Sequence, residues 1–292
     1  MISGAGTFTN AGTITHSGTL YIGYTTLNNL AGAVYNLQGS GLVNNYYSMS
    51  GTVNNAGLFI KSGTGTASIV PSFNNTGTVE VDGGILNIGN FTQTAGSTTL
   101  NGGSLAFSNP AQILGGQLLG SGTINGSVAD IGGLLSPGHS AGSITINGDY
   151  TEGTAGAMLV ELGGLGSGQF DYVDVNGTAS LDGTLEVAFL NGFHPSLGDT
   201  FHFLDFNSRN GQFDAIDVLG DSGYRFNTVY TSSGADLVTT ATPEPGTLSL
   251  LAIGAFCLGI GLWKAKKRPA KAVGTLFCWD IAGIGGPDKN NE

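Results

Sequence analysis

The repeat unit of this chain is clearest in the stretch Asn75-Thr76-Gly77-Thr78-Val79-Glu80-Val81-Asp82. A polar lead and a glycine come first, and apolar and polar side chains then alternate. Alternation with a period of two is the pattern of a β-strand with one buried face. Asparagine and glycine before the strand are typical of a tight turn, because both residues tolerate positive φ. The unit therefore predicts a turn followed by a short strand.

The same unit returns along the first half of the chain. A glycine opens a strand-like run at Gly12, Gly32, Gly57, Gly77, Gly96, Gly122 and Gly142. The steps between these glycines are 20, 25, 20, 19, 26 and 20 residues. A period near twenty is typical of a solenoid in which each repeat forms one coil.

Among solenoids, a parallel β-helix fits the residues best. Leucine-rich repeats need a Leu-x-x-Leu-x-Leu pattern that does not occur, and ankyrin-like repeats need helices. We predict an all-β fold, a right-handed parallel β-helix with coils of about 20 residues. A C-terminal β cap and then one C-terminal transmembrane helix are predicted to follow. A glycine-rich β-sandwich or jelly roll is the rival fold, because short strands with regular turns also fit it.

Composition and charge narrow the function classes. Glycine accounts for 51 of 292 residues without a strict Gly-X-Y period, which excludes collagen, and 40% hydrophobic residues are enough for a core. The formal net charge is −11, and the acidic residues gather between 130 and 236. Such a surface repels nucleic acid, so we expect no nucleic-acid partner. The cysteines are Cys257 and Cys278, so no disulfide framework or cysteine-based metal site is expected before them.

Three stretches between residues 135 and 200 follow one another in a recognisable order. They are Leu135-Ser136-Pro137-Gly138-His139-Ser140, Gln169-Phe170-Asp171-Tyr172-Val173-Asp174-Val175 and Pro195-Ser196-Leu197-Gly198-Asp199-Thr200. This order resembles the end of the β-helical passenger region of autotransporters, just before the export barrel. The resemblance covers most of residues 1–239 and implies structural, not catalytic, roles for these motifs.

The C-terminal region has a different composition. It contains Pro243-Glu244-Pro245, an uncharged apolar stretch from Gly246 to Trp263, and a basic cluster of Lys264, Lys266, Lys267 and Arg268. The apolar stretch reaches the lower limit for a helix that spans a bilayer, and the basic cluster favours a cytoplasmic C-terminus. The order of the three parts closely resembles the PEP-CTERM sorting signal of Gram-negative bacteria.

In the PEP-CTERM family, the membrane protease exosortase recognises Pro-Glu-Pro and removes the anchor, and the protein then reaches the cell surface or the extracellular polysaccharide. The resemblance implies Pro243, Glu244 and Pro245 as recognition residues. It also implies exosortase, the membrane and an exopolysaccharide as partners. An ordinary single-pass anchor is the alternative. The chain begins within a repeat and without a signal peptide, so we expect the natural N-terminus to lie further upstream.

One motif suggests nucleophilic catalysis. Gly138-His139-Ser140-Ala141-Gly142 matches a Gly-x-Ser-x-Gly elbow, and Asp171 or Asp174 and then His194 or His202 follow in the order of an α/β-hydrolase triad. The elbow needs a helix directly after the serine, whereas Ser143-Ile144-Thr145-Ile146 predicts a strand. We therefore interpret the motif as a β-helix corner and predict that the chain is not an enzyme and needs no cofactor.

The acidic residues of the second half allow two further interpretations. Asp171, Asp174, Asp182 and Glu186 offer oxygen ligands for Ca²⁺, but no calcium-loop motif is present. We interpret them as a solvated acidic face and predict no metal site. Paired carboxylates also suggest a polysaccharide lyase or hydrolase, which is the main functional alternative.

Hydroxyl side chains at the start of the chain give the lower alternative. Thr7/Thr9 and Thr13/Thr15 each place two hydroxyls on one strand face. Regular ranks of threonine on a flat β-helix bind ice. We expect these pairs not to recur in the later coils, which argues against an ice-binding protein.

Together these observations predict an exported structural or adhesive protein of the cell surface or extracellular matrix. We predict β-helix repeats over 1–150, last coils and a capping β region over 151–239, and the sorting signal over 240–271. The transmembrane helix is predicted over 246–263, and a disordered tail with no assigned role over 272–292. The N-terminal part would be non-cytoplasmic, and the protein would pass through the inner membrane.

Overall fold

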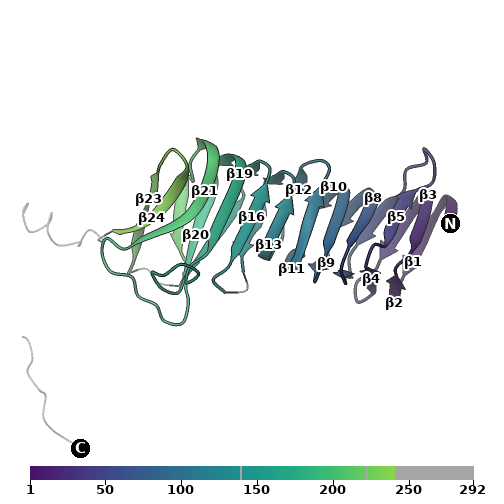
Figure 1. The fold of residues 1–292 in the computed structure, drawn as a ribbon, viewed down its shortest axis with the longest axis horizontal. Helices are drawn as coiled ribbons and strands as arrows, with labels where there is room; N and C mark the ends of the chain where they lie inside the picture. The colour runs from purple at the N-terminus through teal and green to yellow at the C-terminus, as the bar shows by residue number, and fades with distance from the viewer. Residues whose placement is uncertain (139, 221–222, 241–292) are drawn as a thin grey trace, which may run out of the picture. The chain divides into compact units, whose positions relative to one another are not determined.

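The computed structural model describes residues 1–138, 140–220 and 223–240, all within the compact unit Met1–Thr242. These residues form strands and no helix, so the predicted all-β class is confirmed. Within this unit the strands follow one another along a single axis, from β1 to β24 (Figure 1). The predicted transmembrane helix over 246–263 lies outside the described residues. Within the described ranges, no helix has the length and apolar character needed to cross a membrane.

Each strand from β1 to β22 pairs in parallel with strands one turn away, and the pairs form three ladders. Ladder A contains β2 (Thr13–His16), β4 (Val34–Gln38), β7 (Leu58–Ser62), β9 (Thr78–Val81), the starts of β11 (Ser97–Phe107) and β13 (Gln117–Asn125), β15 (Leu134–Pro137), β18 (Ala157–Leu162), β20 (Thr184–Phe189) and β22 (Ala215–Val218). Ladder B contains the starts of β1 (Ile2–Asn10), β3 (Thr19–Asn29), β8 (Thr66–Asn75), β10 (Ile85–Gln93), β19 (Tyr172–Leu181) and β21 (Thr200–Gly211), the ends of β11 and β13, β5 (Leu42–Asn45) and β16 (Ser143–Asn147). Ladder C contains the ends of β1, β3, β8, β10, β19 and β21, with β6 (Thr52–Asn55), β12 (Ala111–Ile113), β14 (Val128–Asp130) and β17 (Tyr150–Glu152).

The register of ladder A gives the length of each turn. Leu58 pairs with Thr78, Thr78 with Ser97 and Ser97 with Gln117, in steps of 20, 19 and 20 residues. The fold is a parallel β-solenoid of about seven turns, which confirms the predicted repeat architecture. A β-sandwich or jelly roll requires antiparallel neighbours, so the parallel ladders exclude that rival for these turns.

The turns lengthen toward the C-terminal end of the described residues. Ala157 pairs with Thr184, and Thr184 pairs with Ala215, in steps of 27 and 31 residues. The added residues form the segments 163–171 and 190–199, which lead from ladder A to ladder B. The parallel order ends at β21, which pairs antiparallel with β24 (Gly234–Thr240), and β24 pairs antiparallel with β23 (Arg225–Tyr230).

The core is a stack of side chains that repeats from turn to turn. Buried residues alternate with outward ones along each strand, as they do throughout β8. Five inward rings form a continuous row, with ring centroids 5.1 to 5.8 Å apart: Tyr35, Phe59, Phe73, Phe91 and Phe107. Aromatic pairs at these separations add to the stabilisation from burial alone. The row therefore ties the early turns to one another.

One interior corner of ladder C is polar. Its residues lie in register and form what we call the corner column: Asn10, Asn29, Asn55, Asn75, Gln93, Ile113, Asp130 and Glu152. Each asparagine of the column donates from Nδ2 to the side-chain oxygen one turn later, over 2.7 to 2.9 Å. Asn55 Nδ2 also donates to the Thr78 carbonyl at 2.9 Å. These bonds satisfy buried amides that would otherwise destabilise the fold.

A buried lysine crosses between two neighbouring turns. The Lys61 side chain is fully buried, and its Nζ donates to the carbonyl oxygens of Ser62, Gly63 and Gly83 at 3.0, 2.7 and 3.0 Å. Burial lowers the pKa of Lys61, because the charged amine loses water. The three carbonyls replace that water and connect the end of ladder A to the following turn.

Candidate functional site

The outward side of ladder C carries uncharged polar side chains throughout its first turns. We call the following pairs the polar rank: Thr7/Thr9, Thr26/Asn28, Thr52/Asn54, Ser72/Asn74 and Asn90/Thr92. All of these residues are partly or fully exposed, and each pair is in register with the next. Because parallel strands lie about 4.8 Å apart, the rank presents hydroxyls and amides at a regular spacing.

Side-chain hydrogen bonds fix part of the polar rank. Asn54 donates to Asn28 at 2.9 Å, and Asn74 donates to Asn54 at 3.0 Å. These bonds hold the amides in one orientation, which reduces the conformational entropy lost when a ligand binds. The rank is therefore a partly pre-organised polar surface.

The Thr7/Thr9 pair does not recur as a pair of threonines, as the sequence predicts. The position of Thr7 continues as Thr26, Thr52 and Ser72 on ladder C, but the position of Thr9 continues as Asn28, Asn54 and Asn74. The Thr13/Thr15 pair lies on ladder A, where its register partners are Val34 and Asn36, so that pair does not recur.

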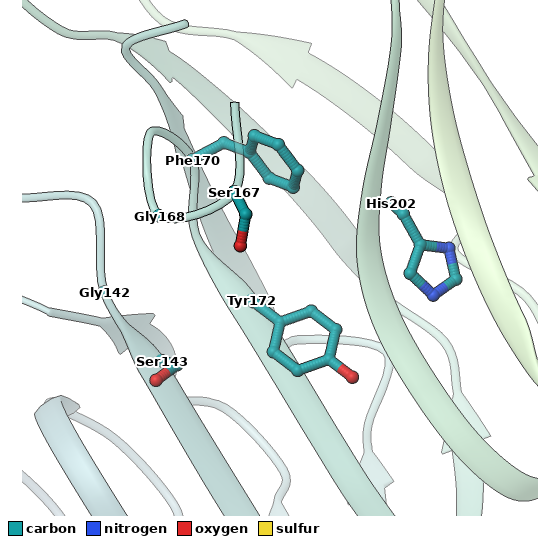
Figure 2. Close-up of a pocket in the computed structure, with 7 residues that line it drawn as sticks. All are labelled: Gly142, Ser143, Ser167, Gly168, Phe170, Tyr172 and His202. Carbon is teal, nitrogen blue, oxygen red and sulfur yellow. The ribbon is translucent and has the colours of Figure 1, made fainter. Parts of the chain in front are cut away.

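A pocket of about 480 Å³ opens where the segment 163–171 leaves ladder A (Figure 2). It is lined by Gly142 and Ser143 at the start of β16, Ser167, Gly168 and Phe170 of the segment, Tyr172 of β19 and His202 of β21. The segment is fixed by its own backbone bonds, from Gly163 N to Gln169 O at 2.7 Å and from Gln169 N to Gly166 O at 2.9 Å. The pocket exists because this turn is longer than those before it.

His202 is bound at both ring nitrogens. Nδ1 lies 2.6 Å from Asp236 Oδ1, and Nε2 lies 2.8 Å from Asp205 Oδ1. The Tyr172 hydroxyl donates to the other Asp205 oxygen. Burial lowers the pKa of His202. Hydrogen bonds and negative charge from Asp236 and Asp205 together raise this pKa by more than burial lowers it, so the net shift is upward. Both ring nitrogens face carboxylate oxygens, which only accept, so the site favours the protonated ring and uses both of its N–H groups.

Asp171 lies between the lining residues Phe170 and Tyr172 in the sequence and holds the backbone of a third lining residue, Gly142. Its two carboxyl oxygens accept the backbone N–H groups of Gly142 at 2.7 Å and Glu161 at 2.9 Å. Burial raises the pKa of Asp171 to about 7, although these two hydrogen bonds lower it. The predicted solvated acidic face is wrong for this residue, because its side chain is fully buried. Asp174, three residues later, is partly exposed on the opposite side of the strand.

The Gly-x-Ser-x-Gly motif leads into strand β16, as the sequence predicts. Ser140 is exposed, and no hydrogen bond joins it to a histidine among the described residues. His194 instead lies 3.0 Å from the Tyr224 hydroxyl, and His202 is bound to two carboxylates. Of these candidate residues only His202 lines the pocket, and neither Ser140 nor Asp171 is among its lining residues. These residues therefore do not form the hydrogen-bonded chain of a triad.

In the later turns the corner column carries two carboxyl groups. Gly133 N donates to Asp130 Oδ1 at 2.7 Å, and the Tyr150 hydroxyl donates to Glu152 Oε2 at 3.0 Å. Asp130 Oδ2 and Glu152 Oε1 are buried without a hydrogen-bond partner. Burial raises the pKa of Glu152 to about 9, with further contributions from Asp130 and Asp182, and it raises the pKa of Asp130 to about 6. Glu152 is therefore protonated at neutral pH.

Sequence reasoning missed the pocket and the corner column. The segment between residues 162 and 172 is longer than the connections between the earlier strands, and this extra length is the sequence feature that points to the pocket. The recurrent asparagine before glycine, as in Asn55-Ala56-Gly57, was interpreted as turn chemistry, although its side chain faces inward. The predicted sorting residues Pro243, Glu244 and Pro245, and the basic cluster after the apolar stretch, lie outside the described residues.

No protein-family model and no curated protein matches the sequence. Within the described ranges, no group of three or more His, Cys, Asp or Glu side chains is placed to hold a metal ion. The polar rank and the pocket are the two surfaces with groups arranged to bind a ligand.

Proposed function

We propose that this chain is an exported structural or adhesive protein of the cell surface or extracellular matrix, sorted by exosortase through the PEP-CTERM signal over 240–271. The order of Pro243-Glu244-Pro245, apolar stretch and basic cluster supports this proposal. The signal would hold the protein in the inner membrane of a Gram-negative bacterium until cleavage. Its N-terminal part would then be non-cytoplasmic and its C-terminus cytoplasmic.

The polar rank is the observation that carries the adhesive role. A polysaccharide presents hydroxyl groups at regular intervals, and the rank presents matching donors and acceptors turn after turn. One such hydrogen bond contributes only about 0.5–1.5 kcal/mol, so useful affinity requires many of them at once. The rank contains no charged side chain, which suits an uncharged or mixed exopolysaccharide as the partner.

The finer features of the fold belong to the same proposal. We assign a right-handed coil to the solenoid and a capping role to β23 and β24. An uncovered last strand would offer its edge to other chains. The antiparallel pairing of β24 with β21 supports the capping role, because it occupies that edge.

A polysaccharide lyase or hydrolase is the weaker candidate. Either enzyme needs carboxyl groups or a base that can exchange protons with the substrate. His202, which lines the pocket, is bonded through both nitrogens, and the neighbouring Asp171 is buried with both oxygens on backbone N–H groups. These contacts favour binding without turnover.

The adhesive role is tested by placing charge on the polar rank. A full-length variant with Thr26→Glu, Thr52→Glu and Ser72→Glu is mixed with the extracellular polysaccharide of the producing organism, and the bound fraction is measured by cosedimentation. We expect an affinity loss of about tenfold or more, because three carboxylates interrupt the uncharged array.

The matched control places the same charges on another side of the solenoid. Thr78→Glu, Ser97→Glu and Gln117→Glu lie at outward, in-register positions of ladder A. This variant should bind as the wild type does. Equal binding by the rank variant and the wild type, or equal loss in both triple variants, would contradict the adhesive role of the rank.

A further inference from the structure

The pocket at segment 163–171 is shaped before any ligand arrives. Segment 163–171 closes on itself through backbone bonds, and Asp171 ties the start of β16 to the end of β18. A volume of about 480 Å³ falls in the range of small-molecule sites, which span about 300–1,000 Å³. A ligand that binds to a rigid concave site does not have to order a loop, so less conformational entropy is lost on binding.

The lining combines aromatic faces with hydroxyl groups. Phe170 packs edge to face against Phe201, with ring centroids 5.6 Å apart, and the Tyr172 ring is oriented by its hydroxyl bond to Asp205. In the view of Figure 2 the Ser167 side chain lies between the Phe170 and Tyr172 rings, whereas the Ser143 hydroxyl points away from Tyr172. The matching ligand is amphipathic, with an apolar face for the rings and hydroxyls around its edge.

The charge around the pocket selects against anions. The lining contains His202, and both of its ring nitrogens already face carboxylates. The neighbouring acids are Asp205 and Asp236, and Asp174 adds a further negative charge near Tyr172. Three carboxylates around one histidine leave an excess of negative charge, so a phosphate or a uronic acid would be repelled.

A sugar ring without charge meets all three conditions. Its C–H face is apolar, its edge carries hydroxyls, and it has no charge to be repelled. We propose that this pocket binds one uncharged pyranose unit of a glycan. The inference rests on the proposed adhesive function but on different residues, since the polar rank lies on the first turns and the pocket on the later ones (Figure 1).

The test measures binding of short, defined sugars to the full-length protein. Uncharged trisaccharides of glucose, mannose, galactose and N-acetylglucosamine, and trigalacturonate as the charged probe, are titrated by isothermal calorimetry. We expect one-to-one binding of at least one uncharged probe and none of trigalacturonate. Tyr172→Ala removes a ring, and Ser167→Trp fills the pocket from an exposed loop position. Each should weaken binding by about tenfold or more.

The control removes an exposed tyrosine ring elsewhere. Tyr47 is 83% exposed and lies on the early turns, so Tyr47→Ala should leave trisaccharide binding unchanged. Ser167→Trp keeps the test valid if Tyr172→Ala fails to fold. The proposal is overturned if no uncharged probe binds, if trigalacturonate binds as tightly, or if Ser167→Trp has no effect.

The two sites fail in distinguishable ways. Ser167→Trp should lose trisaccharide binding and keep cosedimentation with the whole polysaccharide. The triple variant of the polar rank should do the reverse. If cosedimentation depends on the pocket alone, the rank is not the adhesive surface, whereas the sugar site stands.

Discussion

The corner column holds amides in the early turns, from Asn10 to Gln93, and carboxyl groups at Asp130 and Glu152 in the later ones. Each early amide is bonded to the next turn, whereas each later carboxyl group has one buried oxygen without a partner. The early turns are also short, and the later turns carry the segments that form the pocket. The same ladders thus form a repetitive region in the early turns. In the later turns they form a region with unpaired buried carboxyl oxygens and with the pocket.

The largest contrast is expected at two glycines with similar backbone angles. Gly96 has φ +71°, and a Cβ there would lie 1.9 Å from the Gly77 carbonyl oxygen. Gly168 has φ +77°, and a Cβ there would meet nothing within 4 Å. In urea denaturation, Gly96→Ala should lower the free energy of unfolding by about 3 kcal/mol or more, and Gly168→Ala by about 1 kcal/mol. Equal losses would mean that the early turns are not stacked more tightly than the pocket segment.

The amide column should give the next largest effect. Asn55→Ala removes the acceptor of one Asn29 N–H group and the donor to the Thr78 carbonyl and Asn75 Oδ1, so we expect a loss of about 2–4 kcal/mol in the free energy of unfolding. Asn74→Ala is the matched control, because Asn74 is the exposed neighbour of the buried column. The control should change stability by less than about 0.5 kcal/mol. A similar loss in both variants would contradict the structural role of the column.

Stability should depend on pH through the later half of the same column. The pKa of Glu152 is raised to about 9 and that of Asp130 to about 6, so the folded state binds protons more tightly than the unfolded state does. This stabilisation is fully present at acidic pH and is lost as pH rises through 6 and then 9. The melting temperature should fall between pH 5 and pH 9.5, a window that brackets these two values.

Glu152→Gln identifies the group responsible. Glutamine keeps the size of the side chain and cannot ionise, so most of the decline above pH 7 should disappear in this variant. Asp171, with a pKa raised to about 7, leaves a residual slope at lower pH. If Glu152→Gln shows the same alkaline decline as the wild type, the carboxyl pair is not the source of the difference between the two halves.

The sequence predicts the repetitive part better than the irregular part, for a physical reason. Regular alternation after glycine, as in Thr78 to Asp82, reports burial directly and yields the parallel solenoid. The corner column is not visible in the same way, because Asn55 has the same local pattern whether its amide faces a turn or the interior. The pocket brings Ser143 and Tyr172 together through register and adds His202 from the next strand of ladder B, and register between turns of unequal length does not follow from local pattern.

The smallest expected effect is a pKa change at the pocket. Asp236→Asn removes the charge at His202 Nδ1, so the pKa of His202 should fall toward its ordinary value while Asp205 still supports it. NMR titration of the His202 ring protons measures this shift. Because both side chains are partly exposed, the melting temperature should change little. An unchanged pKa would show that the two carboxylates do not hold the ring as a cation.

The most direct test of export through the sorting signal is to measure the size and cellular location of the Glu244→Ala protein in a host with its exosortase. Wild-type protein should be shortened and recovered outside the inner membrane. The variant should stay at full length in the inner membrane, with unchanged β-rich circular dichroism, because the described ladders end at Thr240 and the substitution changes none of their residues. If Glu244→Ala is trimmed and exported as fast as the wild type, Pro243-Glu244-Pro245 is not a recognition motif and the proposed sorting is wrong.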